Sequence, residues 1–164
     1  MNQENIITKG TILQRAGDLK KRAYTVKEGL IRSYLIDENG KEHTFMFAPK
    51  GWLLADPETN INNNPTQLFV ETLEDSIIEI TEDPRVKVSV MPKEHLEMAL
   101  TGTLKRMAVL QNRVLSLMNS PVVKRYEDFI ITYPDIVNRV PQHMIASYLG
   151  VTPEALSRAI KEIK

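Results

Sequence analysis

Hydrophobic and polar positions alternate with a period of two through most of the first half of the chain. Two alternating runs, 30–36 and 43–47, flank Asn39-Gly40, a pair that readily takes the positive φ angles of a type I′ turn. A second pair of runs, in QLFVETLEDSIIEITED, is separated by Glu74-Asp75. Glycines recur roughly every ten residues, a spacing typical of short strands in a barrel or sandwich. The pattern predicts an antiparallel β-structure with two hairpins.

After Pro84 the period changes to that of a helix. From Pro92 onward apolar residues recur every 3 or 4 positions along one side, forming the apolar seam Leu96, Leu100, Leu104, Met107, Leu110, Val114 and Leu117. The helix could pack on the β-structure or pair with a second copy. At 1.5 Å per residue it would extend about 40 Å, longer than a small barrel can cover, which favours a symmetric dimer. A further helix is predicted to start with Ser120 as its cap and Pro121 in its first turn.

The segment VPQHMIASYLGVTPEALSRAIKEIK predicts two short helices separated by a left-handed glycine, Gly150. Thr152 can cap the second helix, Pro153 suits its first position, and Glu154 favours the positive end of its dipole. Ala146 is small where two steeply crossing helices approach each other. The residues expected to face inward are Met144, Ile145, Tyr148, Leu149, Leu156, Ala159, Ile160 and Ile163. This arrangement is a helix-turn-helix pattern.

The remaining side of the last helix presents Glu154, Ser157, Arg158 and Lys161. The major groove of B-DNA admits an α-helix, and such side chains can bond to base edges and phosphates. The alternative interpretation is an ordinary helical hairpin with a polar outer face.

Composition narrows the class of protein. The 164 residues are 42% hydrophobic, enough for one well-buried domain, or one domain plus a small appendage. A run of about 18 apolar residues is missing, and the first residues lack the apolar core of a signal peptide, so no membrane partner is expected and a cytoplasmic location is predicted. The sequence contains no cysteine, which excludes disulfides, thiolate nucleophiles and cysteine-ligated iron–sulfur clusters.

The net charge of zero conceals an uneven distribution. Residues 28–84 carry 12 acidic and 3 basic side chains, whereas residues 85–164 carry 7 acidic and 12 basic ones. The C-terminal half is therefore the part expected to meet an anionic partner. The excess of basic residues is small within 121–164, which contains 6 basic and 5 acidic residues. The alternative is therefore a basic surface that contacts only solvent.

The order of β-structure, long seam helix and helix-turn-helix resembles the CRP/FNR family of bacterial transcription regulators over nearly the whole chain. The stretches TKGTILQRAGDLKKRAYTVKEGLIRSYLIDENGKE and LEDSIIEI look like strands of that family's β-roll. VPQHMIASYLGVTPEALSRAIK is similar to its DNA-binding segment, particularly in Bacteroidetes-type members.

The resemblance implies an α+β fold with a cyclic-nucleotide-binding-like β-roll over 1–90, a dimerisation helix over 91–119 and a winged-helix-like helix-turn-helix over 120–164. It implies a homodimer that reads a roughly palindromic site in double-stranded DNA, with a small-molecule effector and RNA polymerase as further candidate partners. Base contacts would fall on Glu154, Ser157 and Arg158. Phosphate contacts would fall on Gln142, His143, Thr152 and Lys161. The printed chain ends at Lys164, so the β-wing of many family members is not expected.

The sequence departs from the cyclic-nucleotide-binding members in the ligand cassette. Those members hold the phosphate with an arginine and the ribose with a Gly-Glu pair, whereas here Gly51 precedes Trp52 and no arginine occurs between Arg32 and Arg85. Because an anion loses much affinity without such a bidentate partner, cyclic AMP is not expected. Trp52, Leu53 and Gln67 are candidates for an altered effector pocket, although the simpler interpretation of Trp52 is a core aromatic of the roll.

Two other classes of function are weighed against this prediction. A small β-barrel enzyme such as a cupin needs clustered metal ligands, and the three histidines, His43, His95 and His143, are not at ligand spacing. An enzyme, a metal site and a cofactor are therefore not predicted. The other alternative is an effector-binding or interaction module that has lost DNA binding.

Overall fold

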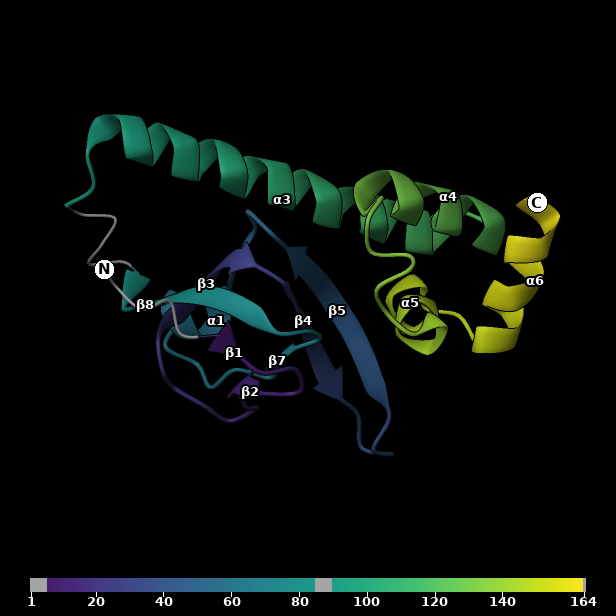
Figure 1. Ribbon diagram of the computed structural model, residues 1–164, viewed down its shortest axis with the longest axis horizontal. Helices are drawn as coiled ribbons and strands as arrows, with labels where there is room; N and C mark the ends of the chain where they lie inside the picture. The colour runs from purple at the N-terminus through teal and green to yellow at the C-terminus, as the bar shows by residue number, and fades with distance from the viewer. Residues whose placement is uncertain (1–5, 85–89, 164) are drawn as a thin grey trace. The chain divides into compact units, whose positions relative to one another are not determined.

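The computed structural model describes residues 6–84 and 90–163 and divides the chain into two compact units, one ending at Val90 and one beginning at Met91 (Figure 1). The first unit is a β-roll and the second is helical, so the predicted α+β fold class is confirmed. Among the described residues, no helix is both long and apolar enough to cross a membrane.

The β-roll consists of two four-stranded antiparallel sheets with the strand orders β1-β8-β3-β6 and β2-β7-β4-β5. A four-residue helix, α1 (Pro57–Asn60), lies between β6 and β7 along the chain. The strands are β1 (Ile6–Ile7), β2 (Ile12–Gln14), β3 (Arg22–Glu28), β4 (Leu30–Ile36), β5 (Glu42–Pro49), β6 (Leu53–Ala55), β7 (Phe69–Thr72) and β8 (Ser76–Glu82).

The prediction of a hairpin around Glu74-Asp75 is wrong, although both of its strands exist. β7 pairs with β4 in one sheet and β8 pairs with β3 in the other, so the chain passes from sheet to sheet at residues 73–75. β3 and β4 make the same passage at Gly29, whose φ is +95°. A methyl group on Gly29 would lie 2.2 Å from Ser76 Oγ, and Ser76 Oγ accepts a hydrogen bond from Leu30 N. The bend therefore requires a glycine.

The hairpin of β4 and β5 is confirmed, but its turn is not of type I′. Of Asn39 and Gly40, both described, only Gly40 has a positive φ angle. Gly40 N donates to Asp37 O at 2.9 Å, and Asp37 N donates to Lys41 O at 3.0 Å. The Asp37 carboxylate also accepts from the backbone N–H groups of Asn39 and Lys41. This local bonding favours a three-residue loop that ends in a left-handed glycine.

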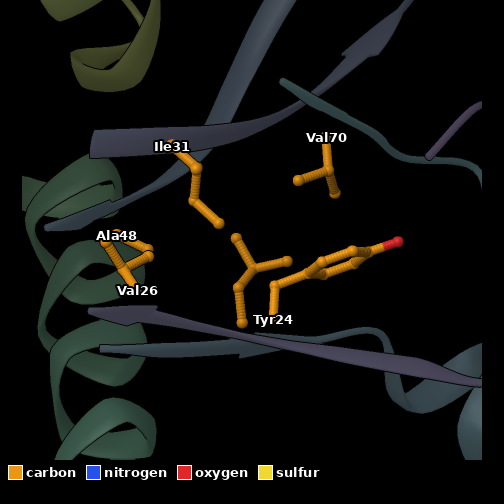
Figure 2. Close-up of a cluster of buried hydrophobic side chains, with 6 residues drawn as sticks. Tyr24, Val26, Ile31, Ala48 and Val70 are labelled. Atoms are coloured by element: carbon orange, nitrogen blue, oxygen red, sulfur yellow. The ribbon is translucent and has the colours of Figure 1, made fainter. Parts of the chain in front are cut away.

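The core of the β-roll lies between the two sheets (Figure 2). Residues from both sheets meet there, and the hydroxyl of Tyr24 points away from the labelled aliphatic side chains and donates to Leu13 O at 3.2 Å. The buried cluster comprises Tyr24, Val26, Ile31, Ala48, Leu54 and Val70. Burial of these side chains is the main stabilising contribution within this unit.

The helical unit contains α3 (Lys93–Asn119), α4 (Val122–Thr132), α5 (Gln142–Leu149) and α6 (Pro153–Ile163). The long helix predicted from Pro92 onward is confirmed, and it continues through Gly102. Ser120 does not cap α4 as predicted. Pro121 occupies that position and its carbonyl accepts from Arg125 N at 3.1 Å, whereas Ser120 ends α3 by donating its N–H to Ser116 O.

Candidate nucleic-acid interface

α5 ends at Gly150, the left-handed cap that the sequence predicts. Its φ and ψ angles are 67° and 34°, and its N–H donates to Ser147 O at 3.1 Å. Val151 N donates to Ala146 O at 3.0 Å. These bonds satisfy carbonyl groups that the end of a helix otherwise leaves without partners. The chain turns sharply here and reaches the next helix within three residues.

α6 begins as predicted, with Thr152 as its cap and Pro153 as its first residue. Thr152 Oγ1 accepts from Ala155 N at 3.2 Å, and Thr152 O accepts from Leu156 N at 3.0 Å. The backbone N–H of Glu154 and then the hydroxyl of Thr152 hold the pKa of the Glu154 carboxyl below its usual range. Glu154 is therefore a carboxylate near neutral pH, placed at the positive end of the helix dipole.

The inward faces of α5 and α6 pack against α4 and against each other. Met144 and Ile160 are half-buried. Ile163 was predicted to face inward but is 41% exposed, because it is the last residue of α6. The buried members of the predicted set are Ile145, Ala146, Tyr148, Leu149, Leu156 and Ala159.

The opposite side of α6 carries the residues predicted to contact DNA. Glu154, Arg158 and Lys161 are exposed, and their spacing of four and three residues places them on one face of the helix. Ser157 is half-buried beside them. The predicted phosphate contacts outside α6 are also exposed: Thr152 just precedes the helix, and Gln142 and His143 form the first turn of α5.

Two arginines that the sequence analysis did not select hold this helix pair in place. Arg113 of α3 donates from Nε and Nη2 to Tyr148 O at 3.1 and 2.8 Å. Arg125 of α4 donates to Leu149 O at 3.1 Å. In the sequence Arg113 lies three residues after the seam residue Leu110, and this spacing does not identify a carbonyl partner on another helix.

The predicted apolar seam of α3 is exposed over most of its length. None of the 27 residues of α3, all of which the structure describes, is buried. Leu110 and Leu117 are only half-exposed, however, and Leu117 lines a cavity of about 40 Å³ together with Phe129 of α4 and Tyr148 of α5. A straight helix drifts by about 20° per heptad against a 3.5-residue repeat, so the far end of the seam turns toward α4 and α5. The exposed members of the predicted seam are Leu96, Leu100, Leu104, Met107 and Val114, and Met118, which was not part of the predicted seam, continues the exposed stripe.

The candidate effector residues lie in the β-roll but do not share one environment. Trp52 is half-buried and packs against the core cluster, Leu53 is half-buried in β6, and Gln67 is exposed. Within the described residues, no group of three or more His, Cys, Asp or Glu side chains could hold a metal ion. The packing of Trp52 agrees with its interpretation as a core aromatic, and a role of Trp52, Leu53 and Gln67 in an effector pocket stays a prediction.

A buried polar network occupies the loop region near these residues. Asp56 accepts hydrogen bonds from Glu58 N at 3.0 Å and from the hydroxyl of Thr66. Gln14 Nε2 donates to Thr66 Oγ1 and to Leu68 O, both at 3.1 Å. Asp56, Thr66 and Gln14 are all buried. The network fastens the loop that follows α1 to strand β2, and it places a carboxylate inside this part of the roll.

Comparison with known proteins agrees with this architecture. No family model matches the chain. It is 26% identical over 165 residues to the nitrogen fixation regulation protein FixK of Rhizobium meliloti, covering 94% of this chain and 72% of FixK. It is 27% identical over 173 residues to the fumarate and nitrate reduction regulatory protein of Escherichia coli, covering 94% of this chain and 66% of that protein. These relatives are regulatory proteins rather than enzymes.

A solved structure extends the comparison to the fold. TTHA1359, a transcriptional regulator of the CRP/FNR family from Thermus thermophilus, superposes with a TM-score of 0.76 at 18% sequence identity. The match covers 97% of this chain and 84% of TTHA1359.

Proposed function

Since this chain belongs to the CRP/FNR family of DNA-binding transcription regulators, we propose that it binds double-stranded DNA as a homodimer, with one α6 helix in the major groove of each half-site. The base-reading residues would be Glu154, Ser157 and Arg158. The phosphate contacts would be Gln142, His143, Thr152 and Lys161. Such a regulator would act in the cytoplasm, where it meets the bacterial chromosome and RNA polymerase.

The observation that carries this proposal is the two-sided character of α6. One side is buried through Leu156 and Ala159, and the other presents Glu154 and Arg158 to solvent on a helix whose start is fixed by a side-chain cap. Arginine can donate two hydrogen bonds to guanine O6 and N7, and a carboxylate can accept from cytosine N4. A helix that is held firmly on one side and polar on the other fits the reading role in a helix-turn-helix.

The unburied α3 helix supports the homodimer. Its exposed stripe, Leu100 to Met118, recurs with the heptad spacing of a two-stranded coiled coil, and exposed Gln111 fills the position between Met107 and Val114. An apolar stripe of this length is stable in water when a second copy covers it. Two copies related by a two-fold axis would present two α6 helices to half-sites about 34 Å apart.

We further propose that the β-roll does not respond to cyclic AMP. The buried Asp56 side chain accepts hydrogen bonds from Glu58 N and the Thr66 hydroxyl, and a carboxylate, as an acceptor, cannot replace the arginine that would hold a phosphate. Arg32 donates to both Glu42 and Glu71, so its charge is already compensated. Adding cyclic AMP should change neither the melting temperature nor the fluorescence of Trp52, the single tryptophan. A shift in either would show that the cassette accepts the nucleotide.

Selection from random duplexes, followed by gel-shift titration, tests DNA reading directly. The enriched sequences should be roughly palindromic, and affinity should fall steeply as salt rises because phosphate contacts release counterions. Arg158→Ala should cost about 1–3 kcal/mol on the selected site and relax its sequence preference. Lys105→Ala removes a charge from an exposed position on α3 and should change neither the affinity for the selected site nor the sequence preference. Enrichment of no duplex would instead favour the interaction module.

A further inference from the structure

The end of α5 is held by side chains from two other helices. A helix leaves its last carbonyl groups without partners, and these groups form the negative end of its dipole. Here the carbonyl of Tyr148 accepts two hydrogen bonds from Arg113 of α3, and the next carbonyl, that of Leu149, accepts one from Arg125 of α4. A cation at this position donates hydrogen bonds to the carbonyl groups and interacts favourably with the negative end of the dipole.

Arg125 also binds the end of α3. Its Nη2 donates to Leu117 O at 3.0 Å and its Nε donates to Ser120 O at 2.9 Å. One planar guanidinium thus joins the last carbonyls of α3 to the last carbonyl of α5. Lysine could not replace it, because an ammonium group does not present several donors in one fixed plane.

Packing restrains the same junction. The guanidinium of Arg113 lies 4.1 Å from the centre of the Tyr148 ring, which in turn contacts the rings of Phe129 and Tyr133 at centroid distances of 5.4 and 5.7 Å. A methyl group on Gly150 would lie 3.1 Å from Leu117 Cδ2, so α5 ends close against α3. Only residues 150–152 separate this junction from the first residue of α6.

We propose that Arg113 and Arg125 are positioning residues that fix the direction of the reading helix α6 relative to α3, and that they thereby set the half-site spacing the homodimer accepts. The inference rests on the proposed function. If α3 is the contact between copies, a rigid link from α3 to α6 determines where the two reading helices stand. Without the link, each helix-turn-helix would still bind its half-site, but the spacing would no longer be selected.

The first experiment measures the link without DNA. The chain has no cysteine, so Lys105→Cys on α3 and Glu162→Cys on α6, both exposed, give a pair of nitroxide sites. Labelled chain is diluted with excess unlabelled chain, and the distance between the two labels is measured by double electron–electron resonance. The parent should give one narrow distribution, and Arg113→Ala/Arg125→Ala a broad one. A distribution equally narrow in the folded double variant, or broad in the parent, overturns the proposal.

Arg106→Ala is the matched control for that measurement. It removes the same group from the same helix, but Arg106 donates to Thr103 of α3 itself, so the distribution should stay narrow. If circular dichroism shows that the double variant does not fold, Arg125→Lys decides the question. That variant keeps the charge and loses the planar fork, and it should broaden the distribution as well. A parent-like distribution in Arg125→Lys would then overturn the proposal.

The second experiment measures spacing selection on the palindrome enriched by the parent. Duplexes with one or two base pairs inserted between the half-sites are compared with the original and with a single half-site. The double variant should lose roughly tenfold in affinity for the original spacing, since flexible attachment lowers the effective concentration of the second reading helix. It should discriminate less between spacings and bind the single half-site as the parent does.

The outcomes separate the two proposals. If the double variant discriminates between half-site spacings as strongly as the parent does, the positioning role is overturned. The control Arg106→Ala should bind every duplex with the affinity of the parent. A parent that enriches no duplex overturns the proposed function, and the label distances then decide the rigid link by themselves.

Discussion

The two units of this protein differ in where their apolar side chains go. In the β-roll, residues from two facing sheets form a closed cluster that includes Tyr24, Ile31 and Val70, each fully buried. In the helical unit, α3 spans 27 residues with none of them buried and carries a stripe of exposed leucine and methionine. The roll is therefore stabilised by its own packing, whereas the apolar stripe of α3 has no such cover from the described residues.

Truncating a core residue of the roll should have the largest effect. Ile31→Ala should lower the free energy of unfolding by about 2–5 kcal/mol, because it leaves a cavity among packed side chains. Ile36→Ala is the matched control on the same strand, since Ile36 is 42% exposed and should cost much less. Urea titration monitored by circular dichroism measures both. Equal losses at the two positions would contradict a closed core in the roll.

A charge in the exposed stripe of α3 should act on association instead. Leu104→Glu places two carboxylates near the two-fold axis of the proposed homodimer and should weaken dimerisation by about 3 kcal/mol, or roughly 100-fold. Met98→Glu is the control, because Met98 is 73% exposed but lies on another side of the same helix. Sedimentation equilibrium measures the dimer dissociation constants of the parent and of both variants. A parent that is monomeric at all concentrations would show that α3 is stable without a second copy.

Gly150 joins α5 to α6 at the point where the end of α5 approaches Leu117 of α3. Gly150→Ala should lower the free energy of unfolding by about 1–2 kcal/mol, because its φ of 67° is left-handed and the new methyl group would press on Leu117. Gly102→Ala, in the interior of α3 with open space around it, should raise stability by about 0.5–1 kcal/mol. Thermal unfolding of both variants shows whether their signs are opposite. A loss in both would mean that α3 does not tolerate a side chain at Gly102.

The cap of α6 should give the smallest change. Thr152→Ala should cost about 1 kcal/mol, whereas Thr101→Ala, within α3, should cost nothing. Because the Thr152 hydroxyl helps to lower the pKa of Glu154, the variant should raise that pKa toward its usual value. A depressed pKa stabilises the fold above the unfolded-state pKa, and this contribution disappears as pH falls through the folded-state pKa. The stability difference between parent and variant should therefore narrow in acid, which NMR titration and unfolding at low pH can test.

Local features were predictable from the sequence because each depends on neighbouring residues. Gly150, Thr152 and Pro153 fix a turn within four positions, and the alternation around Asn39-Gly40 locates a hairpin. The turn type was wrong there because the Asp37 carboxylate bonds to two backbone N–H groups. Propensities of single residue pairs do not include such bonds.

Features that depend on distant segments were not predictable in this way. The strands on either side of Glu74-Asp75 enter different sheets, because β7 pairs with β4 and β8 pairs with β3, both of which lie far earlier in the chain. Arg125 was likewise overlooked, since its carbonyl partner on Leu149 belongs to a helix that starts after a long turn. The exposed face of α6 was found because periodicity alone separates it from the buried face.

The chain crosses from one sheet to the other at Gly29 and again at residues 73–75, and this affects how the roll unfolds. β3 continues into β4 across Gly29, and their partners β8 and β7 are joined by the second crossing. Because each crossing links a strand of one sheet to a strand of the other, we expect that neither sheet separates while the other stays intact. Unfolding should therefore be all-or-none across the roll, with backbone amides of β3 and β4 exchanging with solvent hydrogen at one common rate of global opening. On this expectation, a state in which only one of the two sheets is open should not be populated.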